Sequence, residues 1–171
     1  MTEPVSLYRS ETRELPLANL PSPLLEKLRE HTSKTQLTLE GVRCWLTHSI
    51  NPPAESFFGK LLGRRANPAD PEAEHDTAVV LHPRYVLVAS FGAKRGAIAL
   101  SLPLAQASIA RMSALAARLG GTASEPGMDL TGFPGEHGNA GSYFVKLGED
   151  ADGAECYRAV EAAIVAEKNG V

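Results

Sequence analysis

Three short apolar runs separated by two turn signals, within residues 76–102, constrain the fold of this chain more than any other stretch. The runs cover residues 77–81, 85–91 and 97–102. Pro83 ends the first run because proline cannot donate to a sheet ladder, and Gly92 and Gly96 flank the second turn with residues free to adopt positive φ. Connections this short cannot hold crossover helices. The runs therefore predict three neighbouring antiparallel strands in a meander.

Size and composition favour a single cytoplasmic domain. A chain of 171 residues can bury a real core, and its formal net charge of −3 argues against a basic nucleic-acid binder. Cys44 and Cys156 match neither a metal spacing nor a disulfide framework, which points to a reducing compartment. The N-terminus does not resemble a secretory signal, and no apolar run approaches the ~20 residues that span a bilayer.

The first 35 residues are expected to form an N-terminal arm and a short helix. Residues 1–21 are polar and marked by prolines, which predicts an extended arm. Ser22 would cap a helix with Pro23 at its first position, where a missing N–H costs nothing. This helix would end near residue 32 and bury Leu24, Leu25 and Leu28.

Residues 36–50 alternate between apolar and polar side chains. Leu37 and Leu39 would share one face before Gly41, and Cys44 would lie opposite Trp45 after it. Two interpretations remain open: two short strands bent at Gly41, or one long strand with a bulge there. Trp45 is expected to be a half-buried core or rim residue.

A long connection, residues 51–75, separates this region from the meander. Its middle, residues 57–65, combines apolar with basic side chains at helical spacing, which predicts a short basic amphipathic turn or helix. The apolar members are Phe57, Phe58, Leu61 and Leu62, and the basic members are Lys60, Arg64 and Arg65.

The second half of the chain predicts further strands and a closing helix. Residues 106–111 can be a strand, whereas residues 112–119 favour a helix. Two more strands are expected at residues 127–133 and 142–147. A helix over residues 151–168 would begin at a capping box formed by Asp152 and Glu155. Its apolar stripe is formed by Tyr157, Val160 and Ile164.

This order of elements resembles the pleckstrin-homology-like superfold in its divergent bacterial form. The resemblance rests on the meander with its turn at residues 82–85, on residues 100–104 and 129–133, and on residues 141–147 running into the last helix. It implies an α+β fold over residues 36–171: a bent antiparallel barrel or sandwich of seven strands whose open corner is plugged by the C-terminal amphipathic helix. Residues 1–35, with their helix, and an insertion near residues 105–125 fall outside the pattern.

The same resemblance bears on the ligand. Members of the superfold bind phosphoinositides, peptides or protein domains. Phosphoinositide binders carry a basic cluster between their first two strands, where this chain offers only Arg43. Inositol lipids are therefore not the expected ligand.

No catalytic, metal-binding or cofactor-binding signature emerges. None of the five histidines lies at metal-ligand spacing. Cys44 and His48 would lie about 13 Å apart along a strand, too far for a dyad. The acidic stretch at residues 72–76 is interpreted as a solvated loop edge rather than a set of metal ligands. We expect no enzymatic activity, and an enzyme with an unrecognised site is the weakest alternative.

Two basic features remain as candidate interaction surfaces. The first is the segment at residues 57–65, and the second is Lys94 and Arg95 at the hairpin tip. The leading hypothesis is a non-enzymatic adaptor module that binds a protein or peptide through a sheet edge or the helix groove, with self-association as a further option. The alternative is peripheral binding to an anionic membrane surface through residues 57–65. The other interpretation of this segment is a loop helix that covers an open edge or end of the barrel.

Overall fold

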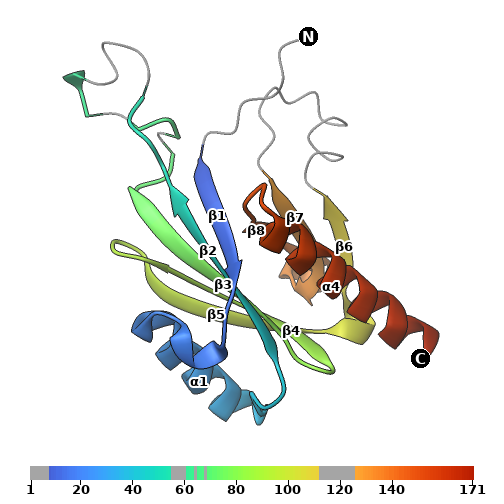
Figure 1. Ribbon diagram of the computed structural model, residues 1–171. Helices are drawn as coiled ribbons and strands as arrows, with labels where there is room; N and C mark the ends of the chain where they lie inside the picture. Colours follow the sequence, from blue (N-terminus) through green and yellow to red (C-terminus); the bar gives the residue numbers. More distant parts are fainter. Residues whose placement is uncertain (1–7, 55–60, 64, 68, 112–125) are drawn as a thin grey trace.

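The computed structural model describes residues 8–54, 61–63, 65–67, 69–111 and 126–171. Over these ranges the chain is an α+β protein with eight strands in two antiparallel sheets, one helix near the N-terminus and one at the C-terminus (Figure 1). None of its helices in these ranges is long and apolar enough to cross a membrane.

The larger sheet has the order β1-β2-β3-β4-β5, and the smaller has the order β6-β7-β8. The first comprises β1 (Arg9–Glu14), β2 (Arg43–Ile50), β3 (Glu74–Leu81), β4 (Tyr85–Gly92) and β5 (Gly96–Pro103). The second comprises β6 (Ser108–Arg111), β7 (Gly127–Pro134) and β8 (Ala140–Lys146). The α-helices are α1 (Ser22–Thr35) and α4 (Ala151–Asn169), and the 3-10 turns are η1 (Leu17–Asn19), η2 (Leu104–Gln106) and η3 (Glu136–Gly138).

The predicted meander is confirmed as β3, β4 and β5. Every neighbouring pair in it is antiparallel. The first turn is closed by the amide of His82, which donates to the carbonyl of Tyr85 at 2.9 Å. At the second turn Gly96 has a φ of +76°, the conformation for which glycine is favoured.

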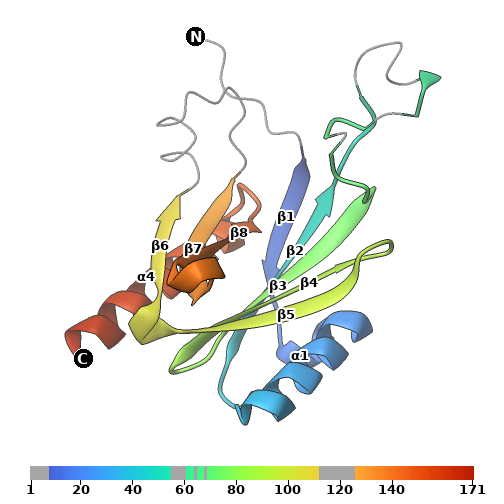
Figure 2. The same ribbon diagram turned by 180° about the vertical axis from the view of Figure 1, so that it is seen from behind.

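The meander strands have continuous apolar sequences because both of their faces are buried, each in a different apolar core. Leu87 and Ala89 of β4 face one core, which α1 covers with Leu24 and Leu28. Val88 and its neighbours on the opposite face enter a second core shared with the smaller sheet and α4. The molecule is thus layered as α1, the five-stranded sheet, and then the smaller sheet with α4 (Figures 1 and 2). Complete burial of each leucine or valine among these stabilises the fold by about 1.5–3 kcal/mol.

The expected barrel is not closed. The two antiparallel sheets share the core around Leu102, Met128 and Val145, but their strands form two separate ladders. The C-terminal helix packs into this core with Tyr157 and Ile164, as its apolar stripe predicted. The strand predicted near residue 108 is also confirmed as β6, whereas residues 112–119 lie outside the described ranges.

The extended arm predicted for residues 1–21 contains a sheet strand. Strand β1 pairs with β2 along its whole length, and Thr12 contacts Thr47 through their hydroxyl groups at 2.7 Å. The predicted serine cap of α1 is also wrong, because Pro21 is the N-cap and Ser22 is the first helical residue. A polar sequence can thus form a strand when a preformed neighbour supplies the ladder.

Three other local predictions are corrected. Residues 37–39 are not a strand; the chain turns at Gly41, where φ is +65°, and β2 begins at Arg43. Trp45 is completely buried rather than half buried, since the core encloses it on the face opposite Cys44. The N-cap of α4 is Asp150, whose carboxylate accepts from the amide of Gly153 at 2.8 Å, and not Asp152.

Candidate interaction surface

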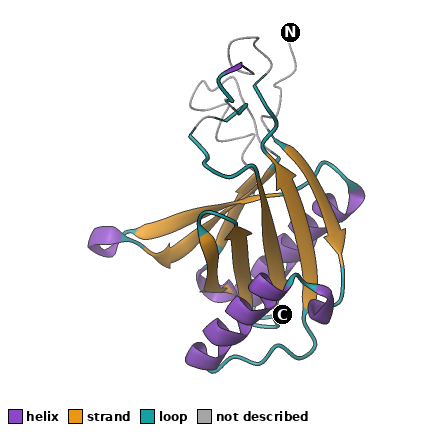
Figure 3. Cartoon of the chain, turned by 90° about the vertical axis from the view of Figure 1, so that its left-hand side faces the viewer, coloured by secondary structure: helices purple, strands orange, loops and turns teal. Residues whose placement is uncertain are grey.

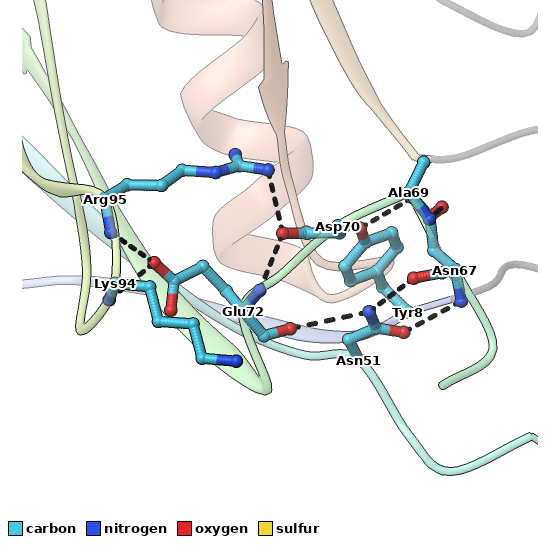
Figure 4. A network of polar contacts seen from close by, with 8 residues as sticks. All are labelled: Tyr8, Asn51, Asn67, Ala69, Asp70, Glu72, Lys94 and Arg95. Atoms are coloured by element: carbon cyan, nitrogen blue, oxygen red, sulfur yellow. Dashed lines mark hydrogen bonds and ion pairs between the residues drawn. The ribbon is translucent and has the colours of Figure 1, made fainter. Parts of the chain in front are cut away.

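A buried polar network joins the loop between β2 and β3 to the tip of the β4–β5 hairpin (Figure 4). Glu72 is only 2% exposed, and one oxygen of its carboxylate accepts from the amides of Lys94 at 2.8 Å and Arg95 at 2.7 Å. Gly92 makes room for this carboxylate, because a Cβ at that position would lie 2.4 Å from Glu72 Oε1. Glu72, a residue of the loop between β2 and β3, therefore holds the tip of the β4–β5 hairpin in place.

Asp70 forms the second centre of this network. Its carboxylate accepts from the Tyr8 hydroxyl at 2.5 Å, the Arg95 guanidinium at 2.9 Å and the Glu72 amide at 3.0 Å. Burial raises the pKa of Asp70, but the hydrogen bonds from Tyr8 and the Glu72 amide, with the charge of Arg95, outweigh it and leave the pKa lowered. Asp70 thus remains ionised and links the chain before β1 to the hairpin tip.

Asn51 anchors the two ends of the loop to each other. It is completely buried, and its side chain bonds to both the amide and the carbonyl of Asn67, each at 3.0 Å. The carbonyl of Asn51 accepts from the guanidinium of Arg65 at 3.2 Å. The interpretation of residues 72–76 as a solvated acidic edge is therefore wrong for Glu72, because hairpin amides 22 and 23 residues further along the chain enclose its carboxylate.

The structure brings part of the predicted basic surface to one end of the sheet. Phe57, Phe58, Lys60 and Arg64 lie outside the described residues. Arg65, Lys94 and Arg95 all contact the polar network through the bonds given above. Leu61 and Leu62 are 71% and 65% exposed on the part of the loop that projects from this end (Figures 1 and 3).

One edge of the five-stranded sheet is capped by carboxylates. The amide of Thr12 in β1 donates to Asp150 at 2.8 Å, and the amide of Glu14 donates to Asp152 at 2.9 Å. Both acceptors lie at the start of α4, which packs beside β1 (Figure 1). Since these amides are occupied, β1 cannot accept another strand at Thr12 and Glu14.

The opposite edge, β5, has no neighbouring strand in the described part of the chain (Figure 2). The amide of Leu104 donates to the carbonyl of Arg84 at 3.0 Å, in register with the β4–β5 ladder. Bonded and non-bonded pairs alternate along an antiparallel ladder, so residues 98, 100 and 102 bond to β4. Ala97, Ala99 and Ser101 therefore direct their N–H and C=O groups away from the sheet.

Strand β5 also lacks the features with which proteins usually protect an edge. It is eight residues long, has no charged residue, and contains proline only at its end, Pro103. Ile98 is 43% exposed on it. By comparison, edge strand β6 has four residues and ends in Arg111. The sequence predicted binding at a sheet edge without identifying which edge.

Two cavities lie beside the start of α4. The larger, about 420 Å³, is lined by Arg111, Glu149 and Tyr157 among others, and the Arg111 guanidinium stacks 4.5 Å from the centre of the Tyr157 ring. The smaller, about 220 Å³, is lined in part by Tyr8 and also contacts Glu149. Among the described residues, no group of three or more His, Cys, Asp or Glu side chains is placed to hold a metal ion.

Both thiols are buried and unpaired with each other. Burial raises the pKa of Cys44 to about 12 and raises that of Cys156 as well. A thiol that does not ionise near neutral pH is neither a nucleophile nor a metal ligand. These two residues therefore contribute to the two cores on either side of the sheet.

Comparison of this chain with models of protein families, with curated proteins and with solved structures gave no match. The resemblance to the pleckstrin-homology-like superfold accordingly stays a prediction.

Proposed function

We propose that this protein is a non-enzymatic binding module that accepts an extended segment of a partner protein as an added strand along β5. The observation that carries this proposal is the open edge, where Ala97, Ala99 and Ser101 direct backbone groups outward from an eight-residue uncharged strand. A strand added there would gain main-chain hydrogen bonds for affinity, and side chains on alternate positions would provide specificity.

The two faces of β5 define what a partner segment should contain. Ile98 and Leu100 lie on the face toward the smaller sheet, and Ile98 is partly exposed, so apolar partner side chains are favoured there. Ala97 and Ala99 lie on the face that α1 covers, which favours small side chains.

Selection from a random linear peptide library displayed on phage tests this function. We expect peptides with alternating apolar residues, and their binding should be lost in the Ile98→Lys variant, whose charge blocks the edge. Val165→Lys is the matched control, because Val165 is likewise an exposed apolar residue, 52% exposed, but belongs to α4 and not to the β5 edge. Selected peptides that bind the Ile98→Lys variant and the control equally well would refute strand addition at β5.

A second candidate function is binding to an anionic membrane surface. It is supported by the exposure of Leu61 and Leu62 on the projecting loop, within a sequence segment that also contains Lys60, Arg64 and Arg65. Co-sedimentation with vesicles of phosphatidylserine and phosphatidylcholine tests it. Binding at low salt that weakens at high salt is expected of this function, and absence of binding at low salt would exclude it.

The proposed compartment is the cytoplasm. The support is the cysteine content, two isolated thiols that make no disulfide framework.

A further inference from the structure

We infer that the segment taken up by β5 is the β5 strand of a second copy of this chain, so that two five-stranded sheets join into one across a two-fold axis. This inference rests on the proposed function and identifies its partner. Edge pairing between identical strands requires that the strand be complementary to itself when reversed. The sequence of β5 and the direction of its backbone groups meet this requirement.

The register follows from the residues whose backbone groups face outward. Placing the two-fold axis at Ala99 sets Ala99 opposite its own copy and Ala97 opposite Ser101 of the second copy. The backbone groups of all three outward-facing residues are then hydrogen-bonded, because each outward N–H lies opposite an outward C=O of the second copy. Pro103 has no N–H to offer, and it falls at the end of this ladder.

The side chains match in the same register. Ile98 would lie opposite Leu100 of the second copy, and Leu100 opposite its Ile98, so four apolar side chains would meet on one face of the joined sheet. This contact would cover the exposed part of Ile98. The side chains on the other face are small: Ala97, Ala99 and Ser101. They leave room for helix α1, which packs over β5. There His31 Nε2 and the Ser101 hydroxyl are hydrogen-bonded at 2.8 Å.

Charge does not oppose the pairing. Strand β5 has no charged residue, and the basic tip residue Lys94 would lie opposite residue 104 of the second copy. The two Lys94 residues would thus be ten positions apart along the ladder, about 33 Å, which exceeds the screening length of about 8 Å at physiological salt. An acidic or basic residue next to Ala99 would have been brought close to its own copy.

The assembly stops at two copies. A sheet that could pair at both edges would grow into a filament. Here the β1 edge is occupied by Asp150 and Asp152, so of the two edges of the five-stranded sheet, β5 is the open one. The carboxylates that cap β1 therefore stop the joined sheet from growing further through its outer edges, which are the two β1 strands.

Sedimentation equilibrium over the micromolar concentration range tests the inference. We expect twice the chain mass for the wild type and for Val165→Lys. Ile98→Lys should raise the dimer dissociation constant about a hundredfold or more, since symmetry places the charge in the contact twice. A wild type with the mass of one chain throughout would overturn the second copy as partner, and so would a dimer unaffected by Ile98→Lys. Peptides selected on a monomeric wild type would then still support the proposed function.

Disulfide trapping tests the register. Ala99→Cys places a thiol beside its own copy, at the Cα separation of about 5.5 Å typical of a directly bonded pair, which is suited to a disulfide. Mild oxidation should therefore link Ala99→Cys into covalent dimers much faster than Ala97→Cys, the matched control on the same face of the same strand. Equal or faster linking of Ala97→Cys would overturn the axis at Ala99. The native thiols do not interfere, because both are buried.

Discussion

Replacing Glu72 by alanine tests whether the loop network holds the β4–β5 hairpin. Its carboxylate accepts two backbone hydrogen bonds, from Lys94 at 2.8 Å and Arg95 at 2.7 Å, and is almost completely buried. A hydrogen bond to a charged group contributes about 1.5–3 kcal/mol to stability. The freed amides lie at a hairpin tip, where water can partly replace the carboxylate. We therefore use the lower value, which gives a loss of about 3 kcal/mol for the two bonds.

The assay is urea unfolding followed by circular dichroism, with a thermal scan beside it. For a chain of this length, about 3 kcal/mol corresponds to a lowering of Tm by about 6–12 °C. Glu72→Gln keeps the shape and one acceptor oxygen, so about half of this loss is expected. The matched control is Glu74→Ala, because the Glu74 side chain is 68% exposed and its carboxylate lies 3.6 Å from His48 Nε2 at the surface.

The control should change the free energy of unfolding by less than about 0.5 kcal/mol, as surface substitutions usually do. If Glu72→Ala unfolds at the same urea concentration as Glu74→Ala, the buried carboxylate does not stabilise the hairpin, and the assignment of Glu72 as its anchor is refuted.

Three further predictions concern the same network and the two cores. Gly92→Ala should destabilise the protein by about 1–3 kcal/mol, because its Cβ would overlap the Glu72 carboxylate; an unchanged urea midpoint would contradict this. Asp70 has a lowered pKa in the folded protein, so its contribution to stability is present above the unfolded value of about 3.9 and is lost as pH falls through the folded value. The unfolding free energy of Asp70→Asn should accordingly depend less on pH below about 4 than that of the wild type, and identical pH profiles would argue against the ionised Asp70. Cys44 and Cys156 should react with a disulfide reagent at neutral pH only after unfolding, since burial raises the pKa of both thiols; fast labelling of the native protein would show that they are accessible.

The central meander could be predicted from the sequence because its evidence is local. Each strand is a continuous apolar run, and Pro83 and Gly96 mark the turns between them. The closing helix was predictable for the same reason, since its apolar stripe has the period of a helix. Only its cap was misplaced, by two residues, because Asp150 and Asp152 both suit a helix start, and it is the Asp150 carboxylate that accepts from the Gly153 amide.

Strand β1 could not be found from its own residues. Its sequence alternates between small polar and charged residues, which is also the composition of an exposed arm. The strand is defined by groups far along the chain, because Asp150 accepts from the Thr12 amide and Gly148 donates to the Thr12 hydroxyl. Edge strands of this kind become visible only when their partners are placed.

The interaction surface was predictable in type but not in place. A sheet edge was expected to bind, yet the sequence does not state which strands lie at the edges. Identifying β5 required the strand order and the capping of β1 by the acidic residues at the start of α4. The anchoring of Lys94 by Glu72 was missed for a similar reason, since it joins residues 22 positions apart.

Amide hydrogen exchange in β5, measured by NMR across a dilution series, tests the central claim most directly. The amides of Ile98, Leu100 and Leu102 face β4 and should be protected at every concentration. We predict that the amides of Ala97, Ala99 and Ser101 exchange quickly in dilute protein and become protected as the concentration rises. Strong protection of these three amides at every dilution, in protein with the mass of a single chain, would contradict the account, because it would mean that the β5 edge is already covered.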